Sequence, residues 1–157
     1  MITGGPGTGK STIINELIKR GYTCLEEISR QVILDAKKNG IDQLFLTNPL
    51  LFSELLLKGR YHQYLESKKL KTDIVFFDRG IPDVLAYMDF IGDKYPESFI
   101  DTCKASIYDE RYEDFDQAVK IHKHLINTYQ SYNYRLIDVP FDTVEKRTDF
   151  ILNIVNM

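Results

Sequence analysis

The chain has 157 residues with a formal net charge of −3, and 43% of its side chains are hydrophobic. This length suits a single domain over residues 1–157, large enough to fold without disulfides or structural metals. Charged residues at 27% and aromatic residues at 12% argue against intrinsic disorder. The mild acidity argues against general nucleic-acid binding, which normally needs a strongly basic face.

The two cysteines and the apolar runs bear on the cellular compartment. Cys24 and Cys103 match no metal or redox spacing, so we expect two small buried thiols in a reducing compartment. No apolar run approaches the roughly 20 residues needed to cross a bilayer. The glycines from Gly4 to Gly7 also interrupt the start of any signal peptide. We therefore expect a cytoplasmic protein without a transmembrane segment.

The first half of the chain begins with a short apolar stub, Met1-Ile2-Thr3, followed by a glycine-rich turn. A helix is predicted over residues 10–20, because Ile13, Ile14 and Leu17 recur on one face. Next come a predicted strand at 22–25, helices at 29–39 and 50–69, and a continuously apolar strand at 74–77 that is typical of a buried parallel sheet.

The second half continues the alternation of helices and strands. Helices are predicted over residues 82–91, 97–107, 115–132 and 143–155, and a strand over 134–139. Strands that alternate with helices predict an α/β fold around a parallel sheet.

Two places depart from this pattern. The first strand has only three residues before the glycines, about 10 Å, where roughly five or six residues are usual. No full strand fits between residues 107 and 115, where the crossover from the strand at 74–77 should return to the sheet. Either the sheet lacks a strand or residues are missing at both places. We favour missing residues, because a lost central strand leaves its neighbours with unpaired buried backbone groups.

The glycine-rich turn has a pattern with known chemistry: Gly4-Gly5-Pro6-Gly7-Thr8-Gly9-Lys10-Ser11 matches G-x-x-x-x-G-K-[ST]. Glycines let successive N–H groups converge on a polyphosphate, and the helix that follows points its positive end at the same anion. We expect Lys10 to reach the β- and γ-phosphates and the Ser11 hydroxyl to bind Mg²⁺. Thr12 is either a second hydroxyl near the α-phosphate or an ordinary first-turn residue. The alternative for the whole segment is a glycine-rich turn with an exposed lysine.

A second group of candidates follows the strand at 74–77. Asp78 stands where a parallel sheet places ligands, and we expect it to hold Mg²⁺ through a water molecule rather than only to cap the turn. Arg79 either contacts a phosphoryl group or an acidic acceptor, or it pairs with a surface acid. Asp83 either receives a substrate hydroxyl or stabilises the start of a helix.

Three further residues are candidates for acceptor binding and catalysis. Glu27 is placed to orient an acceptor hydroxyl or accept its proton, and Arg30 one turn later to clamp an anion. The alternative for Glu27 is a solvated acid at a helix start. Arg111 either bridges the charge that develops on a transferred phosphoryl group or forms a surface pair with a neighbouring acid.

Five segments occur in a characteristic order: GGPGTGKST at 4–12, E-x-x-R at 27–30, FFDRGIPD at 76–83, ERYE at 110–113 and VPFDTVEKR at 139–147. Together they resemble the AAA-type P-loop family that includes the ribosylnicotinamide-kinase-like domain of NadR proteins, and more broadly the nucleoside and nucleotide kinases. The resemblance implies a three-layer fold with helices on both faces of a parallel sheet in the kinase-like order 2-3-1-4-5. Against that family, this sequence lacks the residues for strand 4 and much of the lid.

The resemblance also implies roles for single residues. The Asp-Arg strand end corresponds to Asp78 and Arg79, and the acid that faces the acceptor corresponds to Glu27. The lid arginine corresponds to Arg111, and the loop at 140–143 lies near the nucleotide base.

These observations predict a Mg²⁺-dependent P-loop protein that binds ATP or GTP. The predicted reaction is phosphoryl transfer to a small acceptor such as a nucleoside or a cofactor precursor. Two alternatives stay open: plain nucleotide hydrolysis, and a nucleotide-gated switch that binds a protein or a phosphoinositide.

Overall fold

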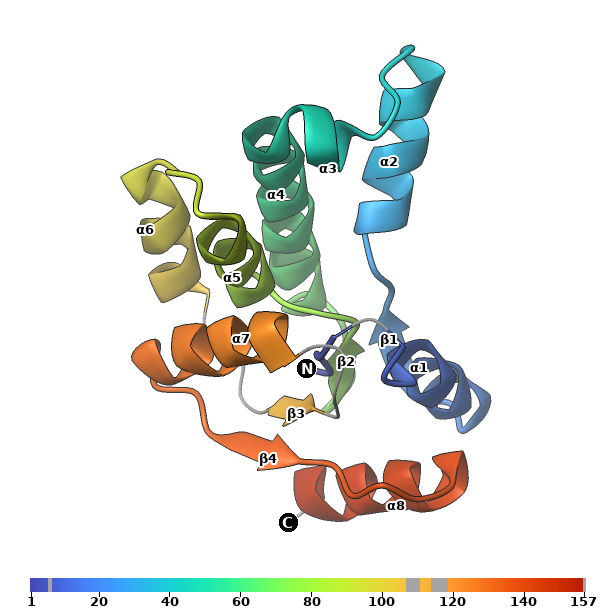
Figure 1. Cartoon of the computed structure of the whole chain (residues 1–157). Helices are drawn as coiled ribbons and strands as arrows, with labels where there is room; N and C mark the ends of the chain where they lie inside the picture. The colour runs from blue at the N-terminus through green and yellow to red at the C-terminus, as the bar shows by residue number, and fades with distance from the viewer. Residues whose placement is uncertain (6, 107–110, 114–118, 157) are drawn as a thin grey trace.

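The computed structural model describes residues 1–5, 7–106, 111–113 and 119–156, with the backbone alone at 111–113 and 119–122. Its helices are α1 (Lys10–Lys19), α2 (Ser29–Lys38), α3 (Leu44–Thr47), α4 (Pro49–Ser67), α5 (Pro82–Ile91), α6 (Glu97–Ala105), α7 (Val119–Ser131) and α8 (Val144–Val155). Its strands are β1 (Thr23–Leu25), β2 (Val75–Phe77), β3 (Arg111–Glu113) and β4 (Leu136–Asp138), and Figure 1 shows the arrangement.

One of two small parallel sheets is built around β2. Strand β1 pairs with it in parallel, with Cys24 opposite Phe76. On the other edge of β2, the N–H of Ile2 donates to the carbonyl of Phe77 over 2.9 Å, and Ile2 forms a parallel bridge with Asp78. The N-terminal stub therefore acts as a very short strand beside β2, which places the glycine-rich turn at the carboxyl edge of this part of the sheet.

The parallel pair β3–β4 forms a second two-stranded sheet, with Tyr112 opposite Ile137. Numbering the stub as the first strand, the two sheets read 2-3-1 and 4-5, which is consistent with the kinase-like order. The prediction that no strand fits between residues 107 and 115 is wrong, and so is the inference that strand 4 is absent. Strand β3 was missed because its three residues, Arg-Tyr-Glu, include no apolar run.

The helices agree with the predicted ones within one or two residues at most of the ends described. The short helix α3 was not predicted, since a single turn carries no helical period. The predicted start of the helix at residue 115 lies outside the described residues, within which α7 begins at Val119. Among these helices none is both long and apolar enough to cross a bilayer.

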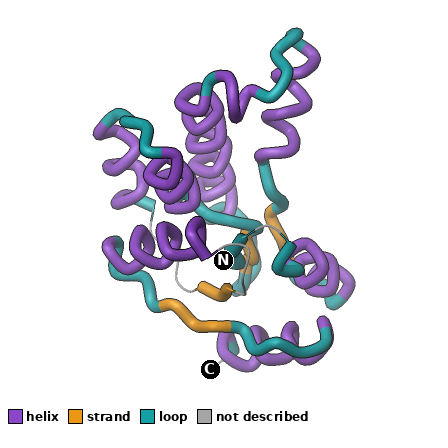
Figure 2. The backbone as a smooth tube through the Cα atoms, viewed as in Figure 1, coloured by secondary structure: helices purple, strands orange, loops and turns teal. Residues whose placement is uncertain are grey.

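Helices cover both faces of the sheet, because adjacent residues of β2 point in opposite directions. Phe76 packs with Leu17 of α1 and Ile151 of α8. Phe77 packs into a second cluster that draws buried side chains from α4, α5 and α7 and includes Leu85. Figure 2 shows the strands between these two groups of helices, a three-layer arrangement.

Candidate functional site

The glycine-rich turn joins the N-terminal stub to α1. Gly4, Gly7 and Gly9 have positive φ angles of 139°, 77° and 82°, a region that side chains make unfavourable. Gly9 is the N-cap residue of α1 and has no side chain with which to cap it. The N–H groups of the first helical turn are therefore left for an anion.

The side chain of Lys10 folds back over this turn. Its Nζ donates to the carbonyl of Gly5 over 2.5 Å and lies 3.3 Å from the Thr8 hydroxyl. That hydroxyl also donates to the carbonyl of Gly5, over 3.0 Å. The ammonium group is thus held at the mouth of the turn by neutral oxygen atoms that phosphate oxygens can replace.

The electrostatic surroundings of Lys10 are mixed. Burial lowers the pKa of its ammonium group to about 8, and the guanidinium of Arg79 acts in the same direction. The carboxylates of Asp78, Asp83 and Glu27 oppose this shift. Lys10 therefore loses its proton more readily than an ordinary lysine until an anion binds.

Asp78 directly follows β2 and is only 8% exposed. Its Oδ1 atom is buried and accepts no hydrogen bond from the residues that the structure describes. Burial raises the pKa of this carboxyl, Glu27 adds to the effect, and Arg79 and Lys10 oppose it. A buried acceptor without a donor is costly, and a hydrated cation would satisfy it.

Arg79 and Glu27 form an ion pair where β1 and β2 end. The Arg79 Nε lies 2.9 Å from Glu27 Oε1, and the two side chains are only 19% and 21% exposed. Burial lowers the pKa of Arg79, but the carboxylates of Asp83, Glu27 and Asp78 outweigh it and raise the pKa overall. The pairing of β1 with β2 explains the contact, because both side chains follow adjacent strand ends.

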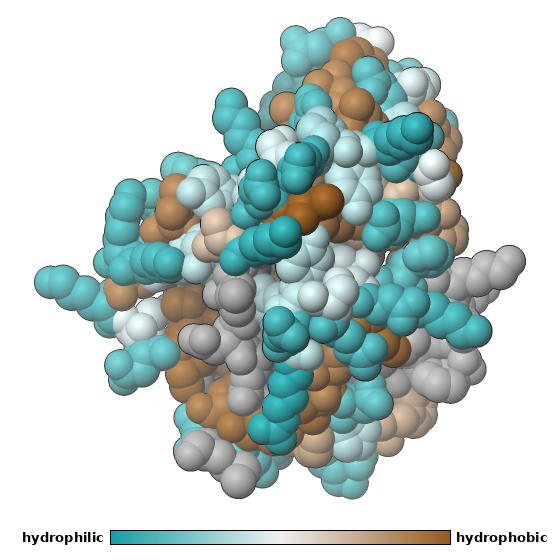
Figure 3. All heavy atoms as spheres, turned by 90° about the vertical axis from the view of Figure 1, so that its left-hand side faces the viewer, coloured by the Kyte–Doolittle hydropathy of each residue, from teal (hydrophilic) through white to brown (hydrophobic). Residues whose placement is uncertain are grey.

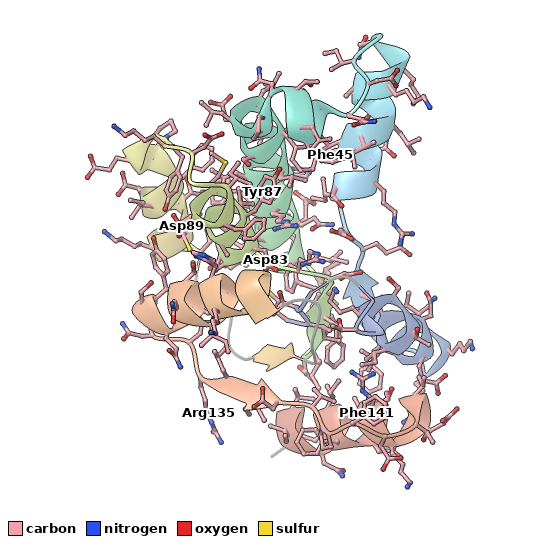
Figure 4. The ribbon with its side chains drawn as sticks, viewed as in Figure 1. Phe45, Asp83, Tyr87, Asp89, Arg135 and Phe141 are labelled. Atoms are coloured by element: carbon pink, nitrogen blue, oxygen red, sulfur yellow. The ribbon has the colours of Figure 1, made fainter. Side chains whose placement is uncertain are left out.

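Asp83 lies in the first turn of α5 and is 6% exposed. One of its carboxylate oxygens accepts the Thr3 hydroxyl, and the other accepts the Tyr129 hydroxyl and the Gly80 N–H, the latter over 2.9 Å. Figure 4 shows Asp83 between α5 and α7. Donors of the fold itself therefore already occupy both oxygens of this carboxylate, and its predicted contact with a substrate hydroxyl stays a prediction.

The remaining predicted residues are more dispersed. Ser11 and Thr12 are exposed on the first turn of α1. Arg30 is exposed on α2, with no hydrogen bond or ion pair to the described residues. The backbone of Arg111 lies in strand β3, and its role in catalysis stays a prediction. The side chain of Arg111 and the whole of Pro6 lie outside the described residues.

Two arginines that contact this region were missed. Arg147 of α8 donates through Nη1 and Nη2 to the carbonyl of Thr8, each over 3.3 Å. Arg60 of α4 is 4% exposed and donates through Nη1 to the carbonyl of Gly80 over 2.6 Å. For Arg60, the sequence did contain a sign of burial, because it is a lone arginine in an apolar part of α4. For Arg147, no feature of the sequence distinguished it from an ordinary surface arginine.

A separate hollow of about 280 Å³ lies between α5, α7 and the segment before α6. Asp89, Tyr95 and His124 are among its lining residues, and the Tyr95 hydroxyl donates to Asp89 over 3.0 Å. None of the described residues of the glycine-rich turn lines this hollow. Hydrophilic and apolar residues are mixed on the side of the molecule that carries α6 (Figure 3).

Comparison with protein families gives a match that spans most of the chain. A family model described as an AAA domain matches residues 1–147. Among curated proteins, none matches the chain significantly.

Solved structures share the fold at low sequence identity. A deoxyadenosine kinase from M. mycoides, with dCMP and dCDP bound, has a TM-score of 0.68 and 18% identity, over 99% of this chain and 97% of that one. A thymidylate kinase from Ehrlichia chaffeensis has a TM-score of 0.66 and 13% identity, over 99% and 96% of the two chains.

The NadR protein in complex with NR has a TM-score of 0.72 and 15% identity, over 99% of this chain and 48% of that one. The present chain therefore spans about half of the NadR chain. With the kinase-like strand order and a family match over residues 1–147, the chain belongs to the AAA domain family, as a P-loop domain of the nucleoside-kinase-like fold.

Proposed function

We propose that this domain binds ATP or GTP with Mg²⁺ and transfers the γ-phosphoryl group to a hydroxyl of a small acceptor, such as a nucleoside or a cofactor precursor. The observation that carries the proposal is the convergence of Lys10, Asp78 and the Glu27–Arg79 pair beside one glycine-rich turn. Phosphoryl transfer needs positioning and charge neutralisation rather than a covalent protein intermediate, and this arrangement supplies both.

The nucleotide phosphates bind in the turn. The N–H groups after Gly9 face them, and Lys10 exchanges its bond to the Gly5 carbonyl for phosphate oxygens. Arg147 of α8 donates a hydrogen bond to the carbonyl of Thr8 and so stabilises the turn. The loop at 140–143 leads into α8, and we assign it to the nucleotide base.

The residues present suit a magnesium ion. Within the part of the chain that the structure describes, no donor reaches the buried Oδ1 of Asp78, and the Ser11 hydroxyl is exposed on the first turn of α1. Mg²⁺ prefers oxygen ligands and keeps several waters, so Ser11 would bind it directly and Asp78 through water. When bound, the ion supplies neutralisation of the phosphate charge.

The Glu27–Arg79 pair serves the acceptor. The acceptor oxygen forms a bond to the γ-phosphorus, the bond from phosphorus to the β–γ bridging oxygen breaks, and the acceptor proton passes to Glu27. Arg79 orients that carboxylate and attracts the transferring group. Arg30 is our candidate for an anionic part of the acceptor, and Arg111 for the developing charge on the phosphoryl group.

The test is transfer of label from γ-labelled ATP or GTP, with Mg²⁺, to a panel of nucleosides and cofactor precursors. We expect label in at least one acceptor. Glu27→Gln should lower the rate by about 10²-fold or more, since general acid–base groups contribute about 10²–10⁴.

The matched control is Glu26→Gln, because Glu26 is the adjacent acid but is exposed, and its backbone carbonyl is what Gln63 contacts. Its rate should stay within about twofold of the wild type, the range expected for a surface change. Label only in free phosphate would replace the proposal with hydrolysis. Nucleotide binding without turnover would replace it with a switch.

A further inference from the structure

Asp83 is the point where three parts of the fold meet. The Thr3 hydroxyl reaches it from the residue just before the glycine-rich turn, and the Tyr129 hydroxyl reaches it from α7. The N–H of Gly80 donates to the same carboxylate from the turn that follows β2, over 2.9 Å. Each of these donors is neutral, so together they stabilise the carboxylate as an anion.

The turn that Asp83 holds carries Arg79 in an unusual backbone conformation. Arg79 has φ of 71°, in the left-handed region that is unfavourable for a residue with a side chain. The N–H of Gly80 is fixed by Asp83, and its carbonyl is fixed by Arg60 over 2.6 Å. Both polar groups of the residue after Arg79 are therefore fixed by buried side chains.

Asp83 also contacts the guanidinium group directly. The Arg79 Nη1 lies 3.3 Å from Asp83 Oδ1, while its Nε lies 2.9 Å from Glu27. The guanidinium is planar, so one anchor on Nη1 and another on Nε determine its orientation. Asp83 is almost fully buried, whereas the Glu27 side chain keeps 21% of its surface exposed. Of the two carboxylates that contact Arg79, Glu27 is therefore the one that a ligand can reach.

From these contacts we infer that Asp83, held by the hydroxyls of Tyr129 and Thr3, is a positioning residue that orients Arg79 toward Glu27. The expected effect of Asp83 on catalysis rests on the proposed function. Its effect on the orientation of Arg79 does not, and can be measured without any activity. These contacts also assign a role to Tyr129, which sequence patterns alone did not single out.

The decisive variant is Tyr129→Phe, which keeps the ring packed against Tyr134 and removes only the hydroxyl. Its matched control is Tyr134→Phe, because the two rings form one edge-to-face pair with centroids 5.1 Å apart. The Tyr134 hydroxyl instead donates to the carbonyl of Ser106, over 3.3 Å, and its loss leaves Asp83 untouched.

The first measurement is hydrogen exchange of the Arg79 Nε–H group by nitrogen-15 NMR, with the signal assigned from its loss in Arg79→Lys. We expect Tyr129→Phe to speed this exchange by about tenfold, the equivalent of about 1.4 kcal/mol of lost hydrogen bonding to a charged group. Thr3→Val, which removes the other hydroxyl, should act in the same direction, and Tyr134→Phe should leave the exchange unchanged.

The second measurement compares nucleotide affinity with kcat/KM for the acceptor found in the transfer assay. Tyr129→Phe should lower kcat/KM about tenfold and leave nucleotide affinity within about twofold. The substitution removes one hydrogen bond, and the residues that this bond orients serve the phosphoryl acceptor and not the nucleotide. A general loss of stability would instead move both quantities, and the Tyr134→Phe variant reports that effect.

Unchanged Arg79 exchange in Tyr129→Phe and Thr3→Val, or an equal increase in Tyr134→Phe, would overturn the inference whatever the activity. If the wild type transfers no phosphoryl group, the proposed function fails. The Arg79 exchange then still decides whether Asp83 positions this arginine.

Discussion

Burial determines the pH range over which the side chain of Lys10 carries its positive charge. Its ammonium group has a pKa of about 8 because burial disfavours the charge, although three carboxylates favour it. Bound phosphate would add negative charge and raise that pKa again. Nucleotide binding above pH 8 must therefore be coupled to uptake of a proton.

We predict that affinity for ATP or GTP falls as the pH rises past about 8, by about tenfold between pH 7 and pH 9, because a neutral amine must first be protonated. Calorimetric titration across this range is the measurement. Lys10→Met should bind weakly with no fall in this range, and a fall of equal size in that variant would assign the pH dependence to another group.

Asp78 provides the corresponding prediction for the metal. Asp78→Asn should lower the gain in nucleotide affinity that Mg²⁺ provides by about 10–100-fold, the usual effect of losing a carboxylate that acts through a metal-bound water. Binding in EDTA should change little. Asp73→Asn, on the exposed approach to β2, is the control, and an equal loss there would argue against the assignment.

The same substitution separates function from stability. Asp78 is buried with one oxygen unpartnered among the described residues, so a neutral amide should cost less to bury than the carboxylate. Urea unfolding should therefore show Asp78→Asn to be at least as stable as the wild type. A marked loss of stability would indicate that Asp78 has a structural role instead.

Sequence patterns predicted some of these residues far better than others. The residues of the glycine-rich turn were proposed from spacing alone, since glycines, a lysine and a hydroxyl at fixed intervals have one common use. Arg147 was missed because its role depends on how α8 packs on the loop, which is a long-range contact. The donors to Asp83 were missed for the same reason, since Thr3 and Tyr129 lie 80 and 46 residues from it.

At the scale of elements, α4 supports the segment after β1 that carries Glu27, through a close contact of the helix. Gly59 of α4 packs against Ile28, the residue after Glu27, and an added Cβ would lie 2.9 Å from two carbons of the Ile28 side chain. Contacts of that length do not persist in real structures, so a larger residue would displace Ile28. The position of Glu27 thus depends on the smallest side chain on α4.

We predict that Gly59→Ala destabilises the protein by about 1–2 kcal/mol, although alanine favours a helix by about 1 kcal/mol, because overpacking costs roughly 1–3 kcal/mol. Urea unfolding is the measurement. Adding Ile28→Ala should make the pair of substitutions less destabilising than the sum of the two single changes. Strict additivity would show that the two residues do not constrain each other.

Helices and strands with a clear pattern of apolar residues were predictable, and very short elements without such a pattern were not. The apolar stripe of α1 and the continuous apolar run of β2 identified both elements. Strand β3 has one apolar residue between two charged ones, and α3 has a single turn, so each depends on neighbours distant in sequence. The sheet order was available only through resemblance to a family, because strand pairing has no local signature.

At the scale of the whole molecule, the two hydrophobic clusters explain why the site lies where it does. Phe76 and Phe77 point to opposite faces, and helices cover each face. Polar chemistry is therefore confined to the strand ends, where β1, β2 and the N-terminal stub deliver Glu27, Asp78 and the phosphate loop to one place. A three-layer fold of this kind binds ligands at that edge.

The claim on which the account depends is that the loop from Gly4 to Ser11 binds a nucleoside triphosphate through Lys10. The most direct measurement is calorimetric titration of the wild type, Lys10→Ala and Lys19→Ala with Mg²⁺ and ATP or GTP at pH 7. Lys19 is the control, being an exposed lysine in the last turn of the same helix. We predict wild-type affinity in Lys19→Ala and a loss of about 100-fold or more in Lys10→Ala, the scale of a lost charge-assisted contact of about 3 kcal/mol. Equal affinity in all three proteins would contradict the account.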